Sequence, residues 1–314
     1  MCPKVSTIIS AYNAARTIRE AIESALRQDY ENQEIIVVND GSTDSTAATL
    51  SEYDGRVHVI TQANRGVASA RNAGVAFSTG EYLAFLDSDD LWMPGKLSTM
   101  IRALEQNPRA SLAFSEFGFI DDEGREYRTS SIRESPKFEE VMTECPFPAA
   151  SLSEGLMTST WVLRRSSFDA VGGFCEAFRG VGWEDCWILV LLRELGEFLY
   201  VADKLTGYRT SQNFDMADKY GPGTEMFIGL VKSRYGARGR RLIRNAKDVQ
   251  CRWLLTRVAH QMDRSDRRGA AESLLQIAKL YPSYFLSRYF LSRLCLSQNI
   301  RRVKEFFMDV STRA

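Results

Sequence analysis

The chain has 314 residues, of which 44% are hydrophobic, and its 40 Lys and Arg balance 40 Asp and Glu. This composition is typical of a globular protein, and we expect a cytoplasmic one, because neither an apolar run of transmembrane length nor a signal-peptide region occurs. Six cysteines without close pairs and two histidines disfavour zinc sites and catalysis by cysteine or histidine.

Short apolar runs and amphipathic runs alternate through the first third of the chain. The apolar runs predict buried strands at 5–10, 34–39, 56–61 and 81–86, and the amphipathic runs predict helices at 15–28, 45–53 and 67–77. This alternation predicts an α/β fold, with a mostly parallel sheet and helices on both of its faces.

The pattern becomes less regular after Pro94. We expect a helix at 96–106, a strand at 110–116, a turn at 121–124 between paired strands, a strand at 158–164, a mostly buried helix at 185–195 and a last strand at 206–210. Residues 130–155 lack periodicity and are interpreted as a mobile flap over the site. From about residue 224 the pattern is helical, so we divide the chain into an α/β domain at 1–222 and a helical region at 223–314.

Polar residues follow several predicted strands at the point where each strand ends. Ser10, Tyr12 and Asn13 lie at the end of the first strand, Asp40 follows the second, and residues 87–90 follow the fourth. Ligands of open parallel sheets bind beyond the carboxyl ends of the strands, so we expect these residues to converge on one rim. The motifs G-x-G-x-x-G and G-x-x-x-x-G-K-[ST] are absent, which disfavours a nicotinamide enzyme and a P-loop NTPase.

The acid cluster Asp87-Ser88-Asp89-Asp90 follows the fourth strand directly. Carboxylates this close repel one another unless a cation or a basic partner compensates them. Hard oxygen ligands suit Mg²⁺ or Mn²⁺, and a protein that supplies one or two carboxylates leaves the other coordination positions to diphosphate oxygens and water. The alternative interpretation is a solvated acidic turn that caps the following helix.

Asp40 enters a tight turn and presents a carboxylate where a nucleobase N–H or a ribose hydroxyl can donate to it. Gly41 permits this turn. Asp44, at the end of the turn, is better interpreted as a cap of the helix that begins near Ser45.

Two arginines lie beside the third predicted helix. Arg71 offers a planar fork of donors to a phosphate or to a neighbouring aspartate. Arg65 is interpreted either as a further ligand contact or as an exposed loop cation.

Glu184 and Asp185 open a predicted buried helix, directly after the segment Gly180-Val181-Gly182-Trp183. A helix N-terminus stabilises ionised carboxylates, so we expect Asp185 to be deprotonated and able to accept a proton from a hydroxyl. The competing interpretation is helix capping. Trp183 either stacks on a sugar or belongs to the core.

Together these residues make the chain resemble the inverting family 2 glycosyltransferases of the GT-A fold, over residues 3–210. An ordered set of short segments carries the resemblance, although any one of them would be weak. The segments are 5–13 (VSTIISAYN), 35–44 (IIVVNDGSTD), 64–66 (NRG), 70–72 (ARN), 85–90 (FLDSDD) and 183–185 (WED).

The resemblance implies a nucleotide-sugar donor, a UDP-sugar in the first instance, and Mn²⁺ or Mg²⁺ as cofactor. It implies that Asp40 contacts the base, that Asp87 meets the ribose and that Asp89 ligates the metal. It also implies that Asp185 is the general base and that Glu184 orients the acceptor. The expected nucleotide-sugar site comprises Ser10, Tyr12, Asn13, Asp40, Arg65, Arg71, Asp87 and Ser88, with Trp183 on the acceptor side.

The chain departs from the family pattern at one position near the metal. Many members carry a histidine shortly after a Tyr-Arg pair, whereas Tyr208-Arg209 is followed here by Thr210-Ser211-Gln212-Asn213. Either Arg209, Gln212 or Asn213 contacts the diphosphate instead, or the metal rests on fewer protein ligands.

The C-terminal region differs from the rest of the chain in charge. Residues 1–230 contain 21 Lys and Arg against 34 Asp and Glu, a net −13, whereas residues 231–314 contain 19 against 6, a net +13. The segment 281–296 interleaves aromatic residues with Arg288 and Arg293, as helices on anionic membranes do. Packing on neighbouring helices or on a second subunit is the simpler interpretation, so peripheral membrane contact and a homo-oligomer both stay open.

The sequence therefore predicts a metal-dependent inverting glycosyltransferase that moves a sugar to a hydroxyl acceptor in glycan, polysaccharide or glycoconjugate synthesis. The acceptor is expected to be a sugar, a lipid-linked glycan or a protein-linked glycan, and no nucleic acid is expected as a partner. A catalytically silent nucleotide-sugar-binding scaffold of the same fold is the alternative. A nucleotidyltransferase is disfavoured, because residues 10–16 offer Arg16 but no Gly-rich basic loop.

Overall fold

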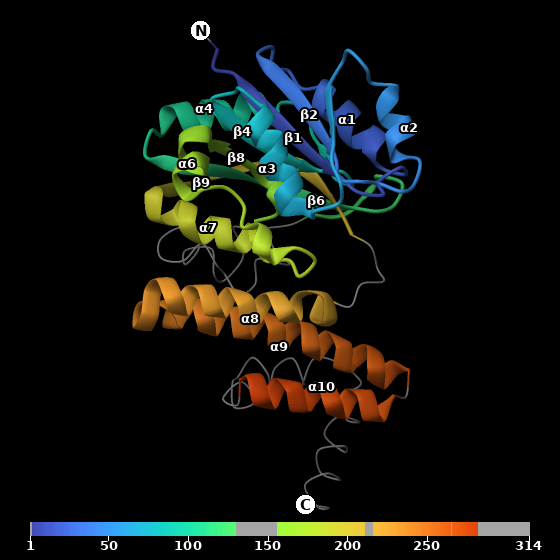
Figure 1. Ribbon diagram of the computed structural model, residues 1–314, viewed down its shortest axis with the longest axis vertical. Coiled ribbons are helices and arrows are strands. Elements are labelled where there is room, and N and C mark those ends of the chain that lie inside the picture. The colour runs from blue at the N-terminus through green and yellow to red at the C-terminus, as the bar shows by residue number, and fades with distance from the viewer. Residues whose placement is uncertain (1, 130–155, 211–215, 265, 282–314) are drawn as a thin grey trace, which may run out of the picture. The chain divides into compact units, whose positions relative to one another are not determined.

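The computed structural model describes residues 2–129, 156–210, 216–264 and 266–281. The chain divides into two compact units, Met1–Phe214 and Asp215–Ala314. The first is a sheet covered by helices, and the second is helical (Figure 1). The segment predicted as a flap, 130–155, lies outside the described residues, as do Gln212, Asn213 and all but the first residue of 281–296.

Within the described residues, nine strands form one sheet in the first unit. The strands are β1 (Val5–Ala11), β2 (Gln33–Asn39), β3 (His58–Thr61), β4 (Tyr82–Asp87), β5 (Leu91–Trp92), β6 (Ala110–Ile120), β7 (Glu126–Thr129), β8 (Trp161–Arg164) and β9 (Glu197–Arg209). Their spatial order is β3-β2-β1-β4-β8-β6-β9-β5, with β7 paired to β6. Strands β3, β2, β1 and β4 are parallel, β8 is antiparallel to both β4 and β6, and β9 is parallel to β6.

Helices cover both faces of this sheet. They are α1 (Ile18–Leu26), α2 (Thr46–Ser51), α3 (Val67–Phe77), α4 (Lys96–Gln106), α6 (Arg165–Val171) and α7 (Glu184–Leu195), with the 3₁₀ turns η1 (Thr158–Thr160) and η2 (Glu176–Phe178). The arrangement confirms the predicted α/β fold.

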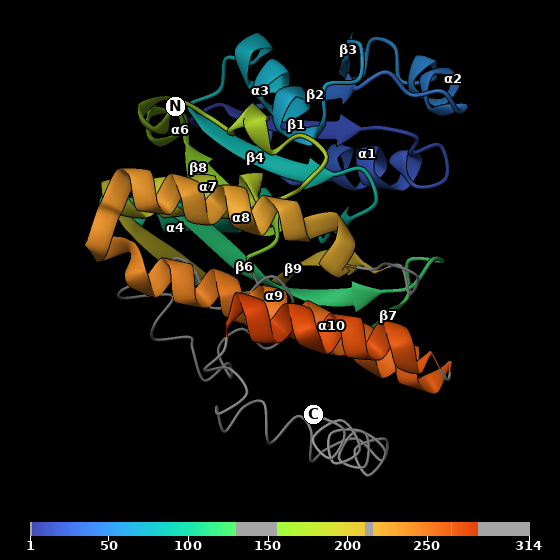
Figure 2. The same ribbon diagram turned by 60° about the horizontal axis from the view of Figure 1, so that its bottom comes forward.

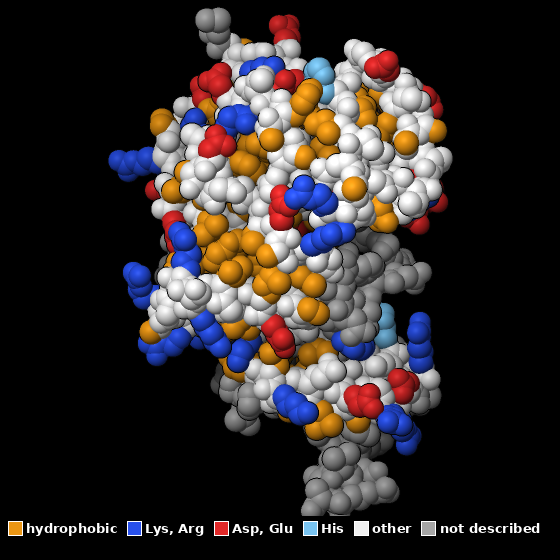
Figure 3. Space-filling view, in the orientation of Figure 1, with side chains coloured by type: hydrophobic (Ala, Val, Ile, Leu, Met, Phe, Trp, Pro, Cys, Tyr) orange, Lys and Arg blue, Asp and Glu red, His pale blue; other side chains and the backbone are white. Residues whose placement is uncertain are grey.

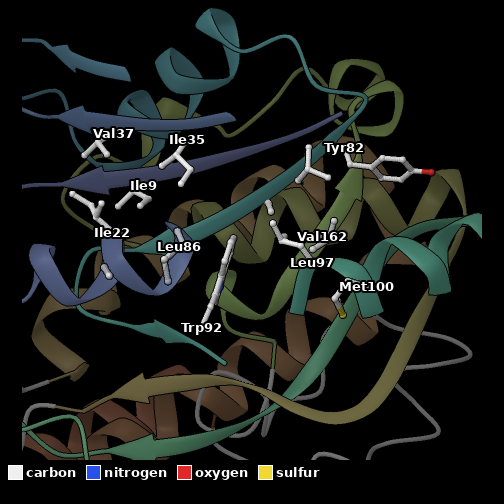
Figure 4. Close-up of a cluster of buried hydrophobic side chains, with 14 of the residues drawn as sticks. Ile9, Ile22, Ile35, Val37, Tyr82, Leu86, Trp92, Leu97, Met100 and Val162 are labelled. Carbon is white, nitrogen blue, oxygen red and sulfur yellow. The ribbon is translucent and has the colours of Figure 1, made fainter. Parts of the chain in front are cut away.

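The central strands are apolar on both faces, because consecutive side chains of a strand point to opposite sides. Ile35 and Val37 of β2 belong to a cluster with residues of α1, α2 and α4, part of which Figure 4 shows. Ile36 and Val38 belong to a second cluster with residues of α3, α6 and α7. The apolar runs of the sequence are therefore continuous because these strands are buried on both faces of the sheet.

Most predicted elements are present with small shifts of their ends, and the last strand differs most. β9 begins at Glu197, well before the predicted start at Thr206. Polar residues such as Asp203 and Lys204 interrupt the apolar pattern of this strand. The strand is defined instead by its parallel pairing with β6. The predicted turn between paired strands is confirmed, because β6 and β7 pair on either side of it.

The second unit contains three described helices, α8 (Met216–Tyr235), α9 (Arg240–Asp263) and α10 (Arg267–Leu280), with the 3₁₀ turn η3 (Gly236–Gly239) between α8 and α9. Helix α9 packs against both α8 and α10, and the helices lie side by side (Figure 2). Leu254 and Val258 of α9 meet Leu274 and Ile277 of α10 in a small apolar core. None of the described helices has the length and apolar character needed to cross a bilayer.

Candidate active site

The carboxyl ends of the parallel strands bring the predicted residues to one rim. Ser10 of β1 lies opposite Val38 of β2 on one side and opposite Asp87 of β4 on the other. Asp40 follows β2 directly, and its N–H donates to the carbonyl of Ala11 at 2.8 Å. Residues far apart in the sequence are therefore neighbours here, as parallel pairing requires.

Asp40 organises the loop that follows β3. Its Oδ1 accepts hydrogen bonds from Gln62 Nε2 at 2.8 Å and from the Arg65 N–H at 2.9 Å, and its Oδ2 accepts from the Gly66 N–H at 2.8 Å. Gly66 has a φ of 91°, in the left-handed region that favours glycine. The carboxylate is buried and holds three donors of the chain, which leaves acceptor capacity for one ligand group.

Asn13 joins the loop after β1 to the loop after β2. Its Oδ1 accepts from the Thr43 N–H at 2.8 Å, and its own N–H donates to Ser42 Oγ at 3.0 Å. Tyr12, beside it, is 50% exposed. The Asn13 side chain is thus used in shaping the rim, while the Tyr12 ring faces solvent.

Asp44 joins the start of α2 to the turn that precedes α1. Its Oδ2 accepts from the N–H of Ala15, just before α1, at 3.1 Å, and its Oδ1 accepts from the N–H of Thr46 in α2 at 3.0 Å. The contact with Thr46, the first residue of α2, supports the capping interpretation of Asp44.

The acid cluster after β4 separates into buried and exposed members. The Ser159 hydroxyl donates to Asp90 Oδ2 at 2.5 Å and accepts from the Asp87 N–H at 3.0 Å. Asp90 is 1% exposed, and its Oδ1 accepts from the Arg209 N–H at 2.9 Å. Asp87 and Ser88 are partly exposed, and Asp89 is exposed. Asp90 therefore anchors the turn, and the other members of the cluster remain at the surface.

Arg209, at the end of β9, joins this turn to two other parts of the unit. Its Nε donates to the Asp89 carbonyl at 2.8 Å, and its Nη1 donates to the carbonyls of Asp121 and Asp122 at 2.6 and 2.7 Å. Its Nη2 forms an ion pair with Glu20 at 2.7 Å, and the side chain is 3% exposed. The described contacts of the Arg209 guanidinium all lie within the fold, which disfavours the alternative in which Arg209 contacts the diphosphate.

An Arg209→Met variant is expected to lose about 3 kcal/mol of free energy of unfolding, because Glu20 and several carbonyls lose their donor. Urea unfolding of the variant and the parent measures this loss. The matched control is Arg102→Met, a change at an exposed position, which we expect to be neutral. Unchanged stability together with weaker UDP binding in Arg209→Met would show instead that Arg209 contacts the diphosphate.

Arg71 of α3 bridges the end of β4 and the start of α7. Its Nη2 donates to Asp87 Oδ1 at 2.7 Å, and its Nη1 donates to Glu184 Oε1 at 3.0 Å. The guanidinium carbon lies 5.1 Å from the centre of the Phe174 ring. The Nε atom is buried and has no hydrogen-bond partner within the described part of the chain. Of the two interpretations of Arg71, the structure shows the contact with an aspartate.

Glu184 and Asp185 form the first turn of α7. Trp183, before them, has a φ of 79°, which is rare for a bulky residue, and its side chain is buried. Glu184 is buried against Arg71, whereas Asp185 is partly exposed. Asp185 Oδ1 accepts from the Cys186 N–H at 2.7 Å. The burial of Trp183 favours its core interpretation over a place on the acceptor side.

Three carboxylates lie around Arg71, and the two at the start of α7, Glu184 and Asp185, have raised pKa values. Burial raises the pKa of Glu184 to about 7, with help from Asp185 and Asp87 and against the effect of Arg71. Burial also raises the pKa of Asp185, while Arg71 and the donors of Cys186 oppose this shift. The sequence-based expectation for Asp185 considered the helix N-terminus alone, and burial acts in the opposite direction.

The raised pKa of Glu184 predicts how stability depends on pH. An unfolded glutamate ionises near its ordinary pKa, so the folded state holds an extra proton between that value and about 7. The parent is expected to lose on the order of 3 kcal/mol of free energy of unfolding, relative to Glu184→Gln, as pH rises through this window. Urea unfolding of both proteins at several pH values measures the difference, and parallel pH profiles would contradict the assignment.

Arg65 lies on the exposed side of its loop. Its Nη2 pairs with Glu176 of η2 at 2.9 Å, and its N–H binds Asp40. This placement supports the interpretation of its side chain as a loop cation.

Buried polar residues that no sequence pattern indicates lie beneath the rim. Lys96 is fully buried, and its Nζ donates to the Thr160 carbonyl and to Thr206 Oγ1, each at 3.1 Å. Burial lowers the pKa of Lys96 to about 7, although Asp90 raises it. Ser159 and Glu20 were missed for the same reason, because their partners lie far away in the sequence and no local pattern marks them.

Few side chains in the described part of this rim could ligate a divalent cation. Within the described ranges, no group of three or more His, Cys, Asp and Glu side chains could hold a metal ion. Asp90 is buried and Asp87 binds Arg71, so Asp89 is the carboxylate of the turn that best fits a cation. A hard oxygen ligand of this kind suits Mg²⁺ or Mn²⁺ that is shared with a diphosphate.

Comparison with known proteins relates the chain to one family and several of its members. The chain matches the family described as glycosyl transferase family 2 over residues 6–172. An uncharacterized glycosyltransferase of Nostoc sp. is 30% identical over 254 residues, which cover 75% of this chain and 78% of the relative. An uncharacterized glycosyltransferase of Rickettsia bellii is 39% identical over 149 residues, 46% of this chain and 21% of the relative.

A named relative is the Escherichia coli UDP-Glc:alpha-D-GlcNAc-diphosphoundecaprenol beta-1,3-glucosyltransferase WfgD. It is 40% identical over 120 residues, which cover 38% of this chain and 47% of WfgD. The matched region thus spans less than half of the length of both WfgD and the Rickettsia bellii relative.

Solved structures of S. aureus TarS share the fold. TarS 1–349 has a TM-score of 0.57 at 16% identity, covering 90% of this chain and 91% of that chain. TarS 1–349 in complex with UDP has a TM-score of 0.54 at 18% identity, and the match covers 80% of this chain and 70% of that chain. TarS 1–349 in complex with UDP-GlcNAc has a TM-score of 0.58 at 16% identity, covering 90% and 82%. At such identities the likeness concerns the fold alone.

Proposed function

Because the chain belongs to glycosyl transferase family 2, we propose that it is an inverting enzyme that transfers a sugar from a nucleotide-diphosphate donor to an acceptor hydroxyl. The observation that carries this proposal is the different placement of two adjacent carboxylates. Glu184 is held by Arg71, whereas Asp185 is partly exposed beside it. Arg71 also holds Asp87 at the carboxyl end of β4, so the base and the donor side share one arginine.

The proposed reaction is one displacement at the anomeric carbon of the donor. The acceptor oxygen attacks this carbon, Asp185 accepts the proton of the hydroxyl, and the bond between the carbon and the diphosphate oxygen breaks. Attack comes from the face opposite the leaving group, so the configuration inverts. Burial raises the pKa of Asp185, which makes it a better proton acceptor than an ordinary aspartate.

We propose UDP as the nucleotide of the donor, which the TarS complexes with UDP and UDP-GlcNAc support through a shared fold. Asp40 would meet the base and Asp87 the ribose, with Ser10, Tyr12, Asn13 and Ser88 along the same rim. Mn²⁺ or Mg²⁺ held by Asp89 would neutralise charge on the departing diphosphate. We also place Arg71 in the nucleotide-sugar site, because its buried Nε is a donor without a hydrogen-bond partner within the described residues.

We propose a lipid-linked sugar as the acceptor, in polysaccharide or glycoconjugate synthesis. The support is the name of WfgD, whose acceptor sugar is attached to diphosphoundecaprenol. A free sugar or a protein-linked glycan as the acceptor is an outcome that an acceptor screen would reveal.

Thermal denaturation with nucleoside diphosphates tests donor binding. UDP is expected to raise the Tm, and to raise it further with Mn²⁺, because a ligand that binds only the folded state stabilises it. A screen of UDP-sugars for nucleotide release, followed by acceptors with the best donor, then tests turnover. A silent scaffold would show the shift without release, and a Tm that no nucleotide changes would refute the proposed donor class.

A further inference from the structure

The second unit carries a basic corner where α8 turns into α9. We give this name to residues 232–247, whose cations are Lys232, Arg234, Arg238, Arg240, Arg241, Arg244 and Lys247. No Asp or Glu interrupts them, and the flanking acids of the chain are Glu225 and Asp248. Figure 3 shows Lys and Arg side chains gathered over the ends of α8 and α9 that η3 joins.

The corner is tight, and all of its cations except Lys247 are exposed. A Cβ atom at Gly239 would lie 2.5 Å from Val231 Cγ1, so the two helices approach closely where η3 joins them. Lys232 at the end of α8 and Arg238 in η3 are exposed, as are Arg240 and Arg244 in α9. Charges from two helices are therefore concentrated at one end of the unit.

The cations at the start of α9 oppose the local electrostatics of that helix, whereas Lys232 and Arg234 in the last turn of α8 suit theirs. A helix N-terminus carries a positive partial charge and favours acidic side chains. Helix α9 is 24 residues long and has no acidic residue in its first turn, where Arg240 and Arg241 lie instead. Mutual repulsion of the cations adds to this cost. Contact with an anionic surface would relieve both effects.

The corner offers charge and not an apolar face. Within the corner, Ala246 is buried, Leu242 and Ile243 are partly buried, and no large hydrophobic side chain is exposed. No described helix is suited to cross a bilayer. A partner of this corner is therefore recognised by negative charge at its surface.

We propose that the basic corner binds a membrane surface that contains anionic lipids. The choice of a membrane rests on the proposed function, because a lipid-linked acceptor lies in a bilayer that the enzyme must reach. Neighbouring lipid phosphates present many charges at once, which match cations spread over η3 and two helix ends better than one small anion does.

Sedimentation of the full chain with lipid vesicles tests the proposal. The parent is expected to bind vesicles of phosphatidylcholine mixed with phosphatidylglycerol, to ignore vesicles of phosphatidylcholine alone, and to be released by salt. In the variant Arg238→Gln/Arg240→Gln/Arg244→Gln, affinity is expected to fall on the order of a hundredfold, about fivefold for each charge.

The matched control is Arg27→Gln/Arg102→Gln/Arg109→Gln, which removes the same charge from exposed positions of the first unit. This control is expected to bind vesicles like the parent. Equal loss in both variants would overturn the proposal, as would equal binding of the parent to both kinds of vesicle. Binding of the parent to heparin but not to vesicles would also overturn it and would indicate a soluble polyanion.

Failure of the proposed function can be distinguished from failure of this inference. UDP-induced thermal stabilisation is measured without vesicles, and the triple corner variant is expected to keep it. If the parent bound anionic vesicles but no nucleotide, the membrane proposal would stand and the proposed nucleotide-sugar donor would be refuted. If the parent bound UDP but no vesicles, the proposed donor would stand and the membrane proposal would be refuted.

Discussion

An Asp185→Asn variant is expected to lose about 10²–10⁴-fold in kcat while binding UDP as tightly as the parent. Asparagine keeps the size of the side chain and can still accept from the Cys186 N–H, as Asp185 Oδ1 does at 2.7 Å. It cannot take the proton of an acceptor hydroxyl. The loss should therefore appear in turnover and not in donor affinity. Nucleotide release in the presence of acceptor, together with a UDP titration, measures both quantities.

The control for this variant is Asp169→Asn, which changes an exposed aspartate of α6 in the same way. It is expected to leave kcat and UDP affinity unchanged. If Asp185→Asn turned over as fast as the parent, Asp185 would not be the base, and Glu184→Gln would be the next variant to assay. Glu184 is the less suitable candidate, because it is buried and its Oε1 is held by Arg71.

The pH dependence of turnover separates the base from the residues that position it. Only ionised Asp185 can accept the proton, so kcat/KM is expected to fall as pH drops through its raised pKa. Arg71 opposes that rise, so Arg71→Gln is expected to move this acid limb to higher pH. A pH profile of kcat/KM for both proteins checks the direction. An unmoved limb in Arg71→Gln would mean that Arg71 does not act on the base.

The parallel half of the sheet could be predicted because its strands are buried on both faces. Ile35 to Val38 reach two different clusters, so they leave a continuous apolar run that no polar residue interrupts. The position of Asp40 and Asp87 at one rim then follows from the parallel direction of the strands. The start of the first helix was predicted three residues too early, because residues 15–17 form a turn in which the Ala15 N–H donates to Asp44 of another loop.

The division of roles within the acid cluster could not be read from the sequence. The letters Asp-Ser-Asp-Asp give no sign that Asp90 is buried and Asp89 exposed. That distinction arises from Ser159 and Arg209, which contact Asp90 across 69 and 119 residues of chain. The role of Arg209 stayed open at the sequence level for the same reason, because its ion pair with Glu20 spans 189 residues.

An Asp89→Asn variant is expected to lose the part of UDP affinity that depends on Mn²⁺, on the order of tenfold to hundredfold, or about 1–3 kcal/mol. Asp89 is the exposed carboxylate of the turn, and its amide isostere is a weak ligand for a hard cation. UDP binding without metal should be nearly unchanged, because Asp40 and Asp87 are intact. Isothermal titration with UDP, with and without Mn²⁺, measures the difference directly.

The matched control is Asp54→Asn, which removes one exposed carboxylate elsewhere in the first unit. The Asp89 carbonyl is held by Arg209, so the backbone of the turn is expected to stay in place in Asp89→Asn, and its Tm should match that of the parent. If the Asp89→Asn protein kept its full response to Mn²⁺, this result would indicate that Asp87 and not Asp89 ligates the metal. Since Asp87 Oδ1 is bound to Arg71, Arg71→Gln would then be expected to strengthen metal binding, whereas a metal held by Asp89 should be nearly indifferent to that change.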